Sequence, residues 1–168
     1  MKRELAHNRR WYPDTQIREE HKNLEVRQVT CFVISKDKKL LLVSKDESSW
    51  SITAGHYEQK KDSTYIDTAI REVYEESGLH TSSQRNSIKE MGYYIVEDIE
   101  KKTGKILEKY IQIRMFLRLD KEAKDLSLKP NEKDQVKYAQ FFSLEKSLEL
   151  IRWLEESPEW KIISVILH

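Results

Sequence analysis

Apolar residues fall into short blocks along this chain, and their spacing changes between the two-residue period of strands and the longer period of helices. Blocks rich in β-branched and other apolar residues predict strands at 26–34, 40–43, 50–53, 91–98, 106–119 and 136–142. The polar stretches 35–39 and 101–105 resemble turns, so each is expected to join the strands on either side of it. These blocks predict a sheet.

A helix is predicted between the third and fourth strands. Apolar residues recur there at the i, i+3, i+4, i+7 spacing of one helix face: Ile66, Ala69, Ile70 and Val73. The helix is expected to begin near Ser63 or Thr64, with Asp62 as a further candidate cap. It is expected to end before Gly78, because glycine suits the left-handed position that follows a helix.

The two ends of the chain carry weaker patterns. Residues 1–25 are polar and are interpreted as an N-terminal arm, with a short helix from Pro13 to Glu20. A second helix is predicted from Ser143 through Leu154, interrupted at Pro158, and the apolar segment 160–167 is expected to pack back on the domain. Residues 26–168 then form one α/β (α+β) domain, a sandwich of helices around a mixed β-sheet.

Composition narrows the class of protein. Charged residues make up 35% of the 168 residues, and the formal net charge of +1 gives no reason to expect a polyanionic partner. The single cysteine, Cys31, lies in an apolar run and excludes an intrachain disulfide. No apolar run approaches the ~18 residues of a membrane span, and the N-terminus lacks the apolar region of a secretory signal. We therefore expect a soluble cytoplasmic protein with no membrane partner.

The predicted helix also carries chemistry. Glu72, Glu75 and Glu76 fall at i, i+3 and i+4, so their carboxylates share a face beside the apolar one. Stacked like charges are unfavourable by roughly 0.2–0.5 kcal/mol per pair unless something neutralises them. Most such clusters are solvated surfaces, but Gly55 in the loop upstream could add a backbone carbonyl, and hard oxygen ligands favour Mg²⁺ or Mn²⁺.

A family resemblance supports the cation. The segment REVYEESGL, from Arg71 to Leu79, resembles the second half of the Nudix box, R-E-U-x-E-E-x-G-U with U apolar, at every specified position. The segment AGHYE, from Ala54 to Glu58, resembles the G-G-H-x-E opening of the same box. The strands before and after these segments also fit, so the resemblance covers roughly residues 26–155 and implies the Nudix fold, an α/β/α sandwich.

The chain departs from the pattern in the loop before the helix. The loop is two residues longer than in the family, and the two ways of counting put Lys61 or Ser63 at the place of the customary glutamate. Only Asp62 offers a carboxylate between those positions, and Ala54 replaces the first glycine. These changes bear on the loop geometry and leave the three helix glutamates untouched.

The resemblance implies hydrolysis of a nucleoside diphosphate derivative with Mg²⁺ or Mn²⁺. Its implied metal ligands are Glu72, Glu75 and Glu76, with the carbonyl of Gly55, and Arg71 would orient the glutamates. The implied general base is a glutamate of the box or a later acid. Glu132 and Asp134, in the loop before the last strand, are candidates, and Glu97 and Asp98 are others. His56 could contact a phosphate and Tyr57 could stack on a base.

Two other readings remain open. The protein could be a catalytically degenerate Nudix-fold nucleotide sensor or interaction module, an idea that the altered loop favours and the intact glutamates oppose. The stretch WSITAGH also resembles the isopentenyl-diphosphate isomerase branch, but isomerases use a cysteine near this loop and Cys31 lies in the first predicted strand. The sequence leaves the substrate open, a capped RNA end included, and a homodimer would be usual for the family.

Overall fold

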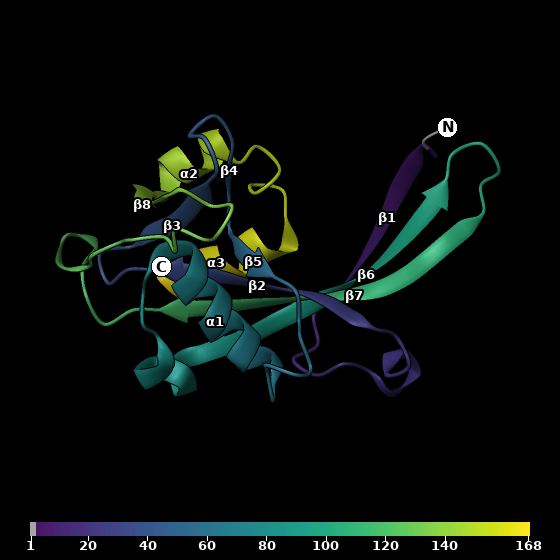
Figure 1. Ribbon diagram of the computed structural model, residues 1–168, viewed down its shortest axis with the longest axis horizontal. Coiled ribbons are helices and arrows are strands. Elements are labelled where there is room, and N and C mark those ends of the chain that lie inside the picture. Colours follow the sequence, from purple (N-terminus) through teal and green to yellow (C-terminus); the bar gives the residue numbers. More distant parts are fainter. Residues whose placement is uncertain (1–2) are drawn as a thin grey trace.

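Two parallel strands form the centre of the protein, β2 (Val26–Ile34) and β7 (Ile106–Arg118). A computed structural model describes residues 3–168 (Figure 1). All other strand pairs are antiparallel, so the sheet is mixed and runs in the order β1-β6-β7-β2-β3-β4, with β5 on β2 and β8 on β3. These strands are β1 (Leu5–Tyr12), β3 (Lys39–Ser44), β4 (Trp50–Ser51), β5 (Thr53–Gly55), β6 (Ile88–Glu100) and β8 (Tyr138–Ser143).

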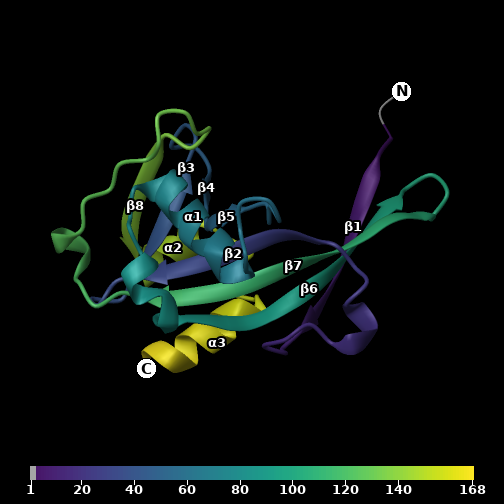
Figure 2. The same ribbon diagram turned by 60° about the horizontal axis from the view of Figure 1, so that its bottom comes forward.

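Helices cover both faces of the sheet. Side chains along β2 alternate between two apolar clusters, because successive residues of a strand point to opposite faces. Val29, Cys31 and Val33 join the cluster that contains Ala69 and Val73 of helix α1 (Tyr65–Ser77). Phe32 and Ile34 join the cluster beneath helices α2 (Leu144–Leu150) and α3 (Pro158–Leu167). Figure 2 shows α1 and α3 on opposite sides of the strands, which confirms the predicted sandwich.

The N-terminal segment differs from the predicted helix. Residues 5–12 form β1, which pairs along its whole length with β6, and only Glu19–His21 form a short 3-10 turn. Together with the adjoining ends of β6 and β7, β1 projects away from the rest of the protein (Figure 1). Residues 5–10 of this edge strand are exposed on both faces, which is why the polar composition alone suggested a solvated arm. The division of the chain at residue 25 stays a prediction.

In the C-terminal region, Pro158 marks the start of a separate helix. The predicted helix from Leu144 ends at Leu150, four residues earlier than expected, although Leu154 is still fully buried. Pro158 is the first residue of α3, whose N-cap Ser157 accepts a hydrogen bond from the backbone N–H of Trp160. Ile163 and Leu167 of α3 are buried, so the segment 160–167 does pack back on the sheet. No helix within residues 3–168 is both long and apolar enough to cross a bilayer.

Candidate active site

Helix α1 is fixed at both ends by its own sequence. Thr64 and Asp67 form a reciprocal capping box: the Thr64 hydroxyl accepts from the Asp67 N–H, and the Asp67 carboxylate accepts from the Thr64 N–H. Gly78 ends the helix at φ +78°, and its N–H donates to the Tyr74 carbonyl. These caps agree with the predicted bounds, and they set the direction in which the glutamates between them point.

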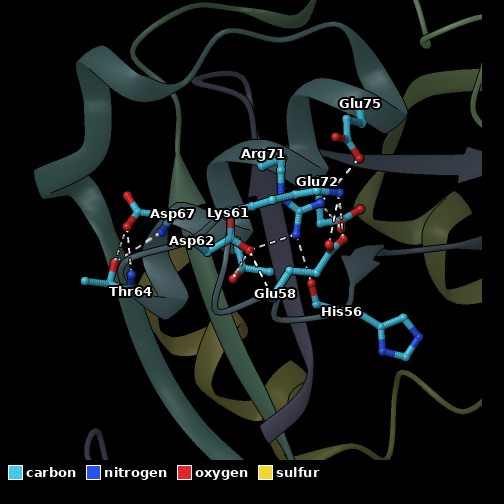
Figure 3. A network of polar contacts seen from close by, with 10 residues as sticks. His56, Glu58, Lys61, Asp62, Thr64, Asp67, Arg71, Glu72 and Glu75 are labelled. Atoms are coloured by element: carbon cyan, nitrogen blue, oxygen red, sulfur yellow. Dashed lines mark hydrogen bonds and ion pairs between the residues drawn. The ribbon is translucent and has the colours of Figure 1, made fainter.

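Arg71 is the hub of the site (Figure 3). Its Nη1 donates to Glu72 Oε1 at 2.6 Å and, more weakly, to Glu75 Oε2 at 3.4 Å. Its Nη2 donates to the backbone carbonyl of His56 at 2.9 Å. One guanidinium thus joins the loop after β5 to two of the three helix glutamates, and the orienting role of Arg71 stays a prediction.

Asp62 is the residue that sequence reasoning left out of the site. Its two oxygens accept from Arg71 Nε at 3.0 Å and Nη2 at 2.8 Å, and Oδ2 also accepts from the Thr68 hydroxyl at 2.9 Å. Only 3% of Asp62 is exposed, and its hydrogen bonds to Arg71 lower the pKa of the carboxyl. The sequence signal was that Asp62 is the only carboxylate between the two places counted for the customary glutamate. The longer loop brings this shorter acid to Arg71.

Position 55 requires a glycine, because the Glu72 carboxyl lies close to the backbone there. A Cβ atom built on Gly55 would lie 1.9–2.3 Å from the carboxyl atoms of Glu72, so no larger residue fits while Glu72 keeps this position. Pairing of β5 with β2 holds Gly55 opposite Val29, close to α1. The loop backbone and the Glu72 carboxylate are therefore in direct contact, as a shared ligand set would need.

Glu76 is the most perturbed acid of the site. It is 8% exposed, and burial together with the negative charges of Glu72 and Asp134 raises its pKa to about 8. A hydrogen bond from the Ala54 backbone N–H opposes the shift, but the Oε2 atom is buried without a hydrogen-bond partner. Burial likewise raises the pKa of Glu72, where Arg71 opposes the effect. A buried acceptor without a donor costs free energy unless another group joins it.

The loop before β8 brings Asp134, and not Glu132, toward these acids. Asp134 lies near enough that its charge raises the pKa of both Glu72 and Glu76. Glu132 is exposed and lines an open pocket on the outer side of the loop with Tyr74 and His80. Of the two acids predicted as downstream bases, Asp134 is the one whose charge acts on Glu72 and Glu76, and the part of either acid as a base stays a prediction.

Backbone hydrogen bonds fasten that loop to the last turn of α1. Lys129 N–H donates to the Ser77 carbonyl and Asn131 N–H to the Glu75 carbonyl, each at 2.8 Å. The final carbonyls of a helix lack partners within it, so the loop satisfies them from outside. Gly78 permits this contact, because a Cβ atom there would lie 2.4 Å from the Lys129 carbonyl oxygen.

The two residues proposed for substrate contact are placed differently. His56 is exposed, and its ring points away from Arg71 in Figure 3, although its carbonyl belongs to the network. Tyr57 is half-buried and packs edge-on against Tyr65, with ring centroids 4.7 Å apart. Neither ring contacts the helix glutamates in the part of the chain that is described.

The donor set fits a hard divalent cation only in part. Carboxylate and carbonyl oxygens suit Mg²⁺ or Mn²⁺, and the unpartnered Oε2 of buried Glu76 is an acceptor that such an ion would satisfy. Within residues 3–168, however, no three His, Cys, Asp or Glu side chains converge into a ready-made cage. Arg71 engages oxygens of Glu72 and Glu75, so these two acids would turn part of their carboxylates from the guanidinium to the ion.

Comparison with known proteins finds a matching family model and solved structures with a similar fold. The family model of the NUDIX domain matches residues 24–162. The NUDIX domain of Shewanella oneidensis NrtR complexed with ADP ribose is 11% identical over 80% of this chain and 82% of its own, with a TM-score of 0.56. The dihydroneopterin triphosphate pyrophosphohydrolase of E. coli is 12% identical over 75% and 88%, with a TM-score of 0.54. A search among curated proteins finds no match.

Proposed function

The chain belongs to the Nudix family, and from that membership we propose that it is a metal-dependent hydrolase of nucleoside diphosphate derivatives. The observation that carries the proposal is Glu76, a buried carboxyl with an unpartnered oxygen next to two further acids. Clustered acids at a helix face are stabilised when a cation or a charged substrate complex joins them. The family match explains why these acids are kept together despite that cost.

In this proposal Glu72, Glu75 and Glu76 hold the ion, and the carbonyl of Gly55 is available beside Glu72. Mg²⁺ or Mn²⁺, when bound, would neutralise phosphate oxygens and lower the pKa of the attacking water. Arg71, held by Asp62, keeps Glu72 in place. Since the diphosphate is negatively charged, none of these acids could approach it without such an ion.

Asp134 is the base that we propose. It would accept a proton from the water that attacks one phosphorus of the diphosphate, as the bond from that phosphorus to the bridging oxygen breaks. Its nearness to Glu72 and Glu76 supports this choice over Glu132. An acid on a loop fastened to α1 can reach the water without giving up a place among the helix ligands.

The proposed substrate class is supported by the family match and not by the shape of a pocket. Solved neighbours are described with ADP ribose or as acting on dihydroneopterin triphosphate, at identities of 11% and 12%. We therefore propose a small nucleotide as the partner and leave open which derivative it is. A capped RNA end belongs in the same test panel.

The direct test is release of phosphate or nucleotide from a substrate panel with Mg²⁺ or Mn²⁺. The panel holds ADP-ribose, nucleotide sugars, dinucleoside polyphosphates, oxidised nucleotides and capped RNA. We expect turnover of at least one compound, and we expect Glu76→Gln to lower kcat by at least about a hundredfold, the scale of losing a key electrostatic contact in catalysis. Glu97→Gln is the matched control, since Glu97 binds Asn8 and Lys109 on the projecting strands.

A second candidate is a nucleotide sensor without catalysis. The observation in its favour is that Glu72 and Glu75 bind Arg71, and that the acids form no ready-made cage among the described residues. Tight binding of a panel compound without turnover at any metal tested would decide for the sensor. Isomerase activity is disfavoured, because Cys31 is buried in β2 and burial raises the pKa of its thiol to about 12.

A further inference from the structure

Two adjoining cavities lie beside the N-terminal end of α1, apart from the acids of the candidate active site. The first has a volume of about 340 Å³ and lies between residues 14–24 and strands β6 and β7. The second has a volume of about 470 Å³ and is lined by the loop before α1, Tyr57 included. Tyr65 and Glu90 line both, so the two cavities are neighbours with these side chains at their common border. Cavities of this size suit small organic ligands.

Glu90 is the unusual residue of this region. It lies on β6 next to a bulge at Met91, and its neighbours Ile88 and Tyr93 belong to the apolar cluster on the α1 side. Glu90 is half-buried, and burial raises the pKa of its carboxyl. Its side chain makes no hydrogen bond or ion pair with any residue from 3 to 168. A carboxylate in such a place has two acceptor oxygens to offer to a ligand.

The other charges around the cavities balance. Asp14 lines the first cavity and is paired with Arg18, while Lys22 in the same wall is paired with Glu19. Arg85 lines the second cavity and is paired with Asp67. Among these charges only Glu90 is left without an ion-pair partner within residues 3–168, so its oxygens are the ones open to a ligand that carries hydrogen-bond donors.

Aromatic and aliphatic surface surrounds those acceptors. Tyr65 is half-buried and lines both cavities, and Tyr57 packs edge-on against it in the second. Tyr93 and Ile113 also border the first cavity, but both are buried, and the Tyr93 ring stacks on Tyr12. Aromatic walls favour a flat ring, which stacks or packs edge-on at little entropic cost. A flat ring with two adjacent N–H donors would meet both oxygens of Glu90.

We propose that these cavities form a second ligand site, which takes a purine base or nucleoside of the guanine type, with its ring N–H and amino group donated to Glu90. The site goes beyond the proposed hydrolysis and does not depend on it. Tyr65 lies on the same face of α1 as Glu72, seven residues and about 10.5 Å along the axis. Thr68, which lies between Tyr65 and Glu72 on the helix, is buried and donates to Asp62 of the loop, so this buried contact separates the cavities from the acids.

Calorimetric titration with guanosine tests the proposal. We expect saturable binding to the full chain, and at least about tenfold weaker binding of inosine, which lacks the amino group. Glu90→Gln replaces one acceptor with a donor and should weaken guanosine binding by a similar factor. Glu97→Gln, on the same strand but paired with Lys109, should leave it unchanged.

Two further measurements separate this site from the candidate active site. Glu76→Gln should keep guanosine binding while hydrolysis is lost, and a loss of both would overturn the second site. Absence of saturable guanosine binding, or equal binding of guanosine and inosine, would also overturn it. The comparison of the two nucleosides uses the unmodified protein, so it remains decisive even if Glu90→Gln fails to fold.

Discussion

Protonation of Glu76 is coupled to folding, because the pKa of its carboxyl in the folded protein differs strongly from the ordinary value. Its ordinary pKa is 4.5, and burial beside Glu72 and Asp134 raises this to about 8 in the fold. Between these values the unfolded chain has lost the proton that the folded protein keeps. The metal-free protein should therefore lose stability as pH rises from about 4.5 toward 8.

Glu76→Gln should remove that pH dependence. We expect the metal-free variant to be more stable than the parent at pH 8 by at least about 1 kcal/mol, since one pKa unit corresponds to about 1.36 kcal/mol. The two should converge near pH 4.5, where both carry an uncharged side chain. Urea unfolding at several pH values measures this, and parallel pH profiles for the two proteins would contradict it.

Asp62 has a positioning role through Arg71. Replacing it should therefore alter how Arg71 holds the glutamates, although Asp62 itself is not proposed to contact the substrate. Asp62→Asn removes the charge that holds the guanidinium and should lower kcat and the apparent affinity for Mg²⁺ by about 10–100-fold, as for other residues that orient metal ligands. Asp62→Glu keeps the charge and should retain more activity than Asp62→Asn.

The matched control for Asp62 lies in the same loop. Within residues 3–168 the Glu58 side chain is paired only with Lys61, so Glu58→Gln should leave the metal dependence unchanged. If Asp62→Asn and Glu58→Gln gave the same titration with Mg²⁺, Arg71 would not need its buried partner.

At the scale of elements, the end of α1 and the loop of residues 129–134 form one unit. The loop binds the carbonyls of Ser77 and Glu75, and Gly78 leaves room for the Lys129 backbone. Asp134 follows directly after these contacts. The position of the proposed base thus depends on how the helix ends.

Gly78→Ala tests this unit. The backbone there has φ +78°, which costs an alanine about 1–2 kcal/mol, and the added Cβ would also collide with Lys129. Gly104 has a similar φ of +69° but open space around it, so Gly104→Ala measures the backbone cost alone. Thermal or urea unfolding should show Gly78→Ala as clearly the more destabilised variant. Equal losses of stability in the two variants would mean that the loop of residues 129–134 can move away from the added Cβ without loss of free energy.

At the scale of the whole molecule, α3 is joined to the sheet by a buried ion pair. Arg114 on β7 donates through Nε to Glu159 Oε1 at 3.0 Å, and Tyr94 on β6 donates to Glu159 Oε2 at 2.8 Å. Glu159 is fully buried and Arg114 is 5% exposed. Such a pair fixes where the helix docks more than it adds net stability, because desolvation offsets the attraction.

Breaking one side of this pair should be costly. Glu159→Ala leaves the Arg114 charge buried without compensation and should destabilise the protein by about 3–5 kcal/mol. The double variant Arg114→Met, Glu159→Met should recover most of that loss. Lys146 and Glu149, an exposed pair, provide the control, since Glu149→Ala should cost at most about 1 kcal/mol. A double variant no better than Glu159→Ala would contradict the argument.

Local signals in the sequence were enough for the helix and the strands around it. Thr64, Gly78 and the apolar residues between them determine α1 through hydrogen bonds and packing within a few residues, so its bounds followed from the pattern. The strand 5–12 was missed, because an edge strand exposed on both faces lacks the apolar alternation of a half-buried one. The end of α2 was predicted too late, because Leu154 fits the apolar spacing of the helix but is buried in the segment that follows it.

The sequence by itself determined the fold class and the family, and it singled out the three glutamates as the predicted site, since periodicity and motif are properties of neighbouring residues. Only the tertiary structure decided that Asp62 binds Arg71, that the charge of Asp134 acts on Glu76, and that Glu90 has no hydrogen-bond or ion-pair partner within residues 3–168. The reason is physical. These facts depend on which loops cross in space, and loop paths are set by distant backbone contacts such as those of Lys129 and Asn131 with α1.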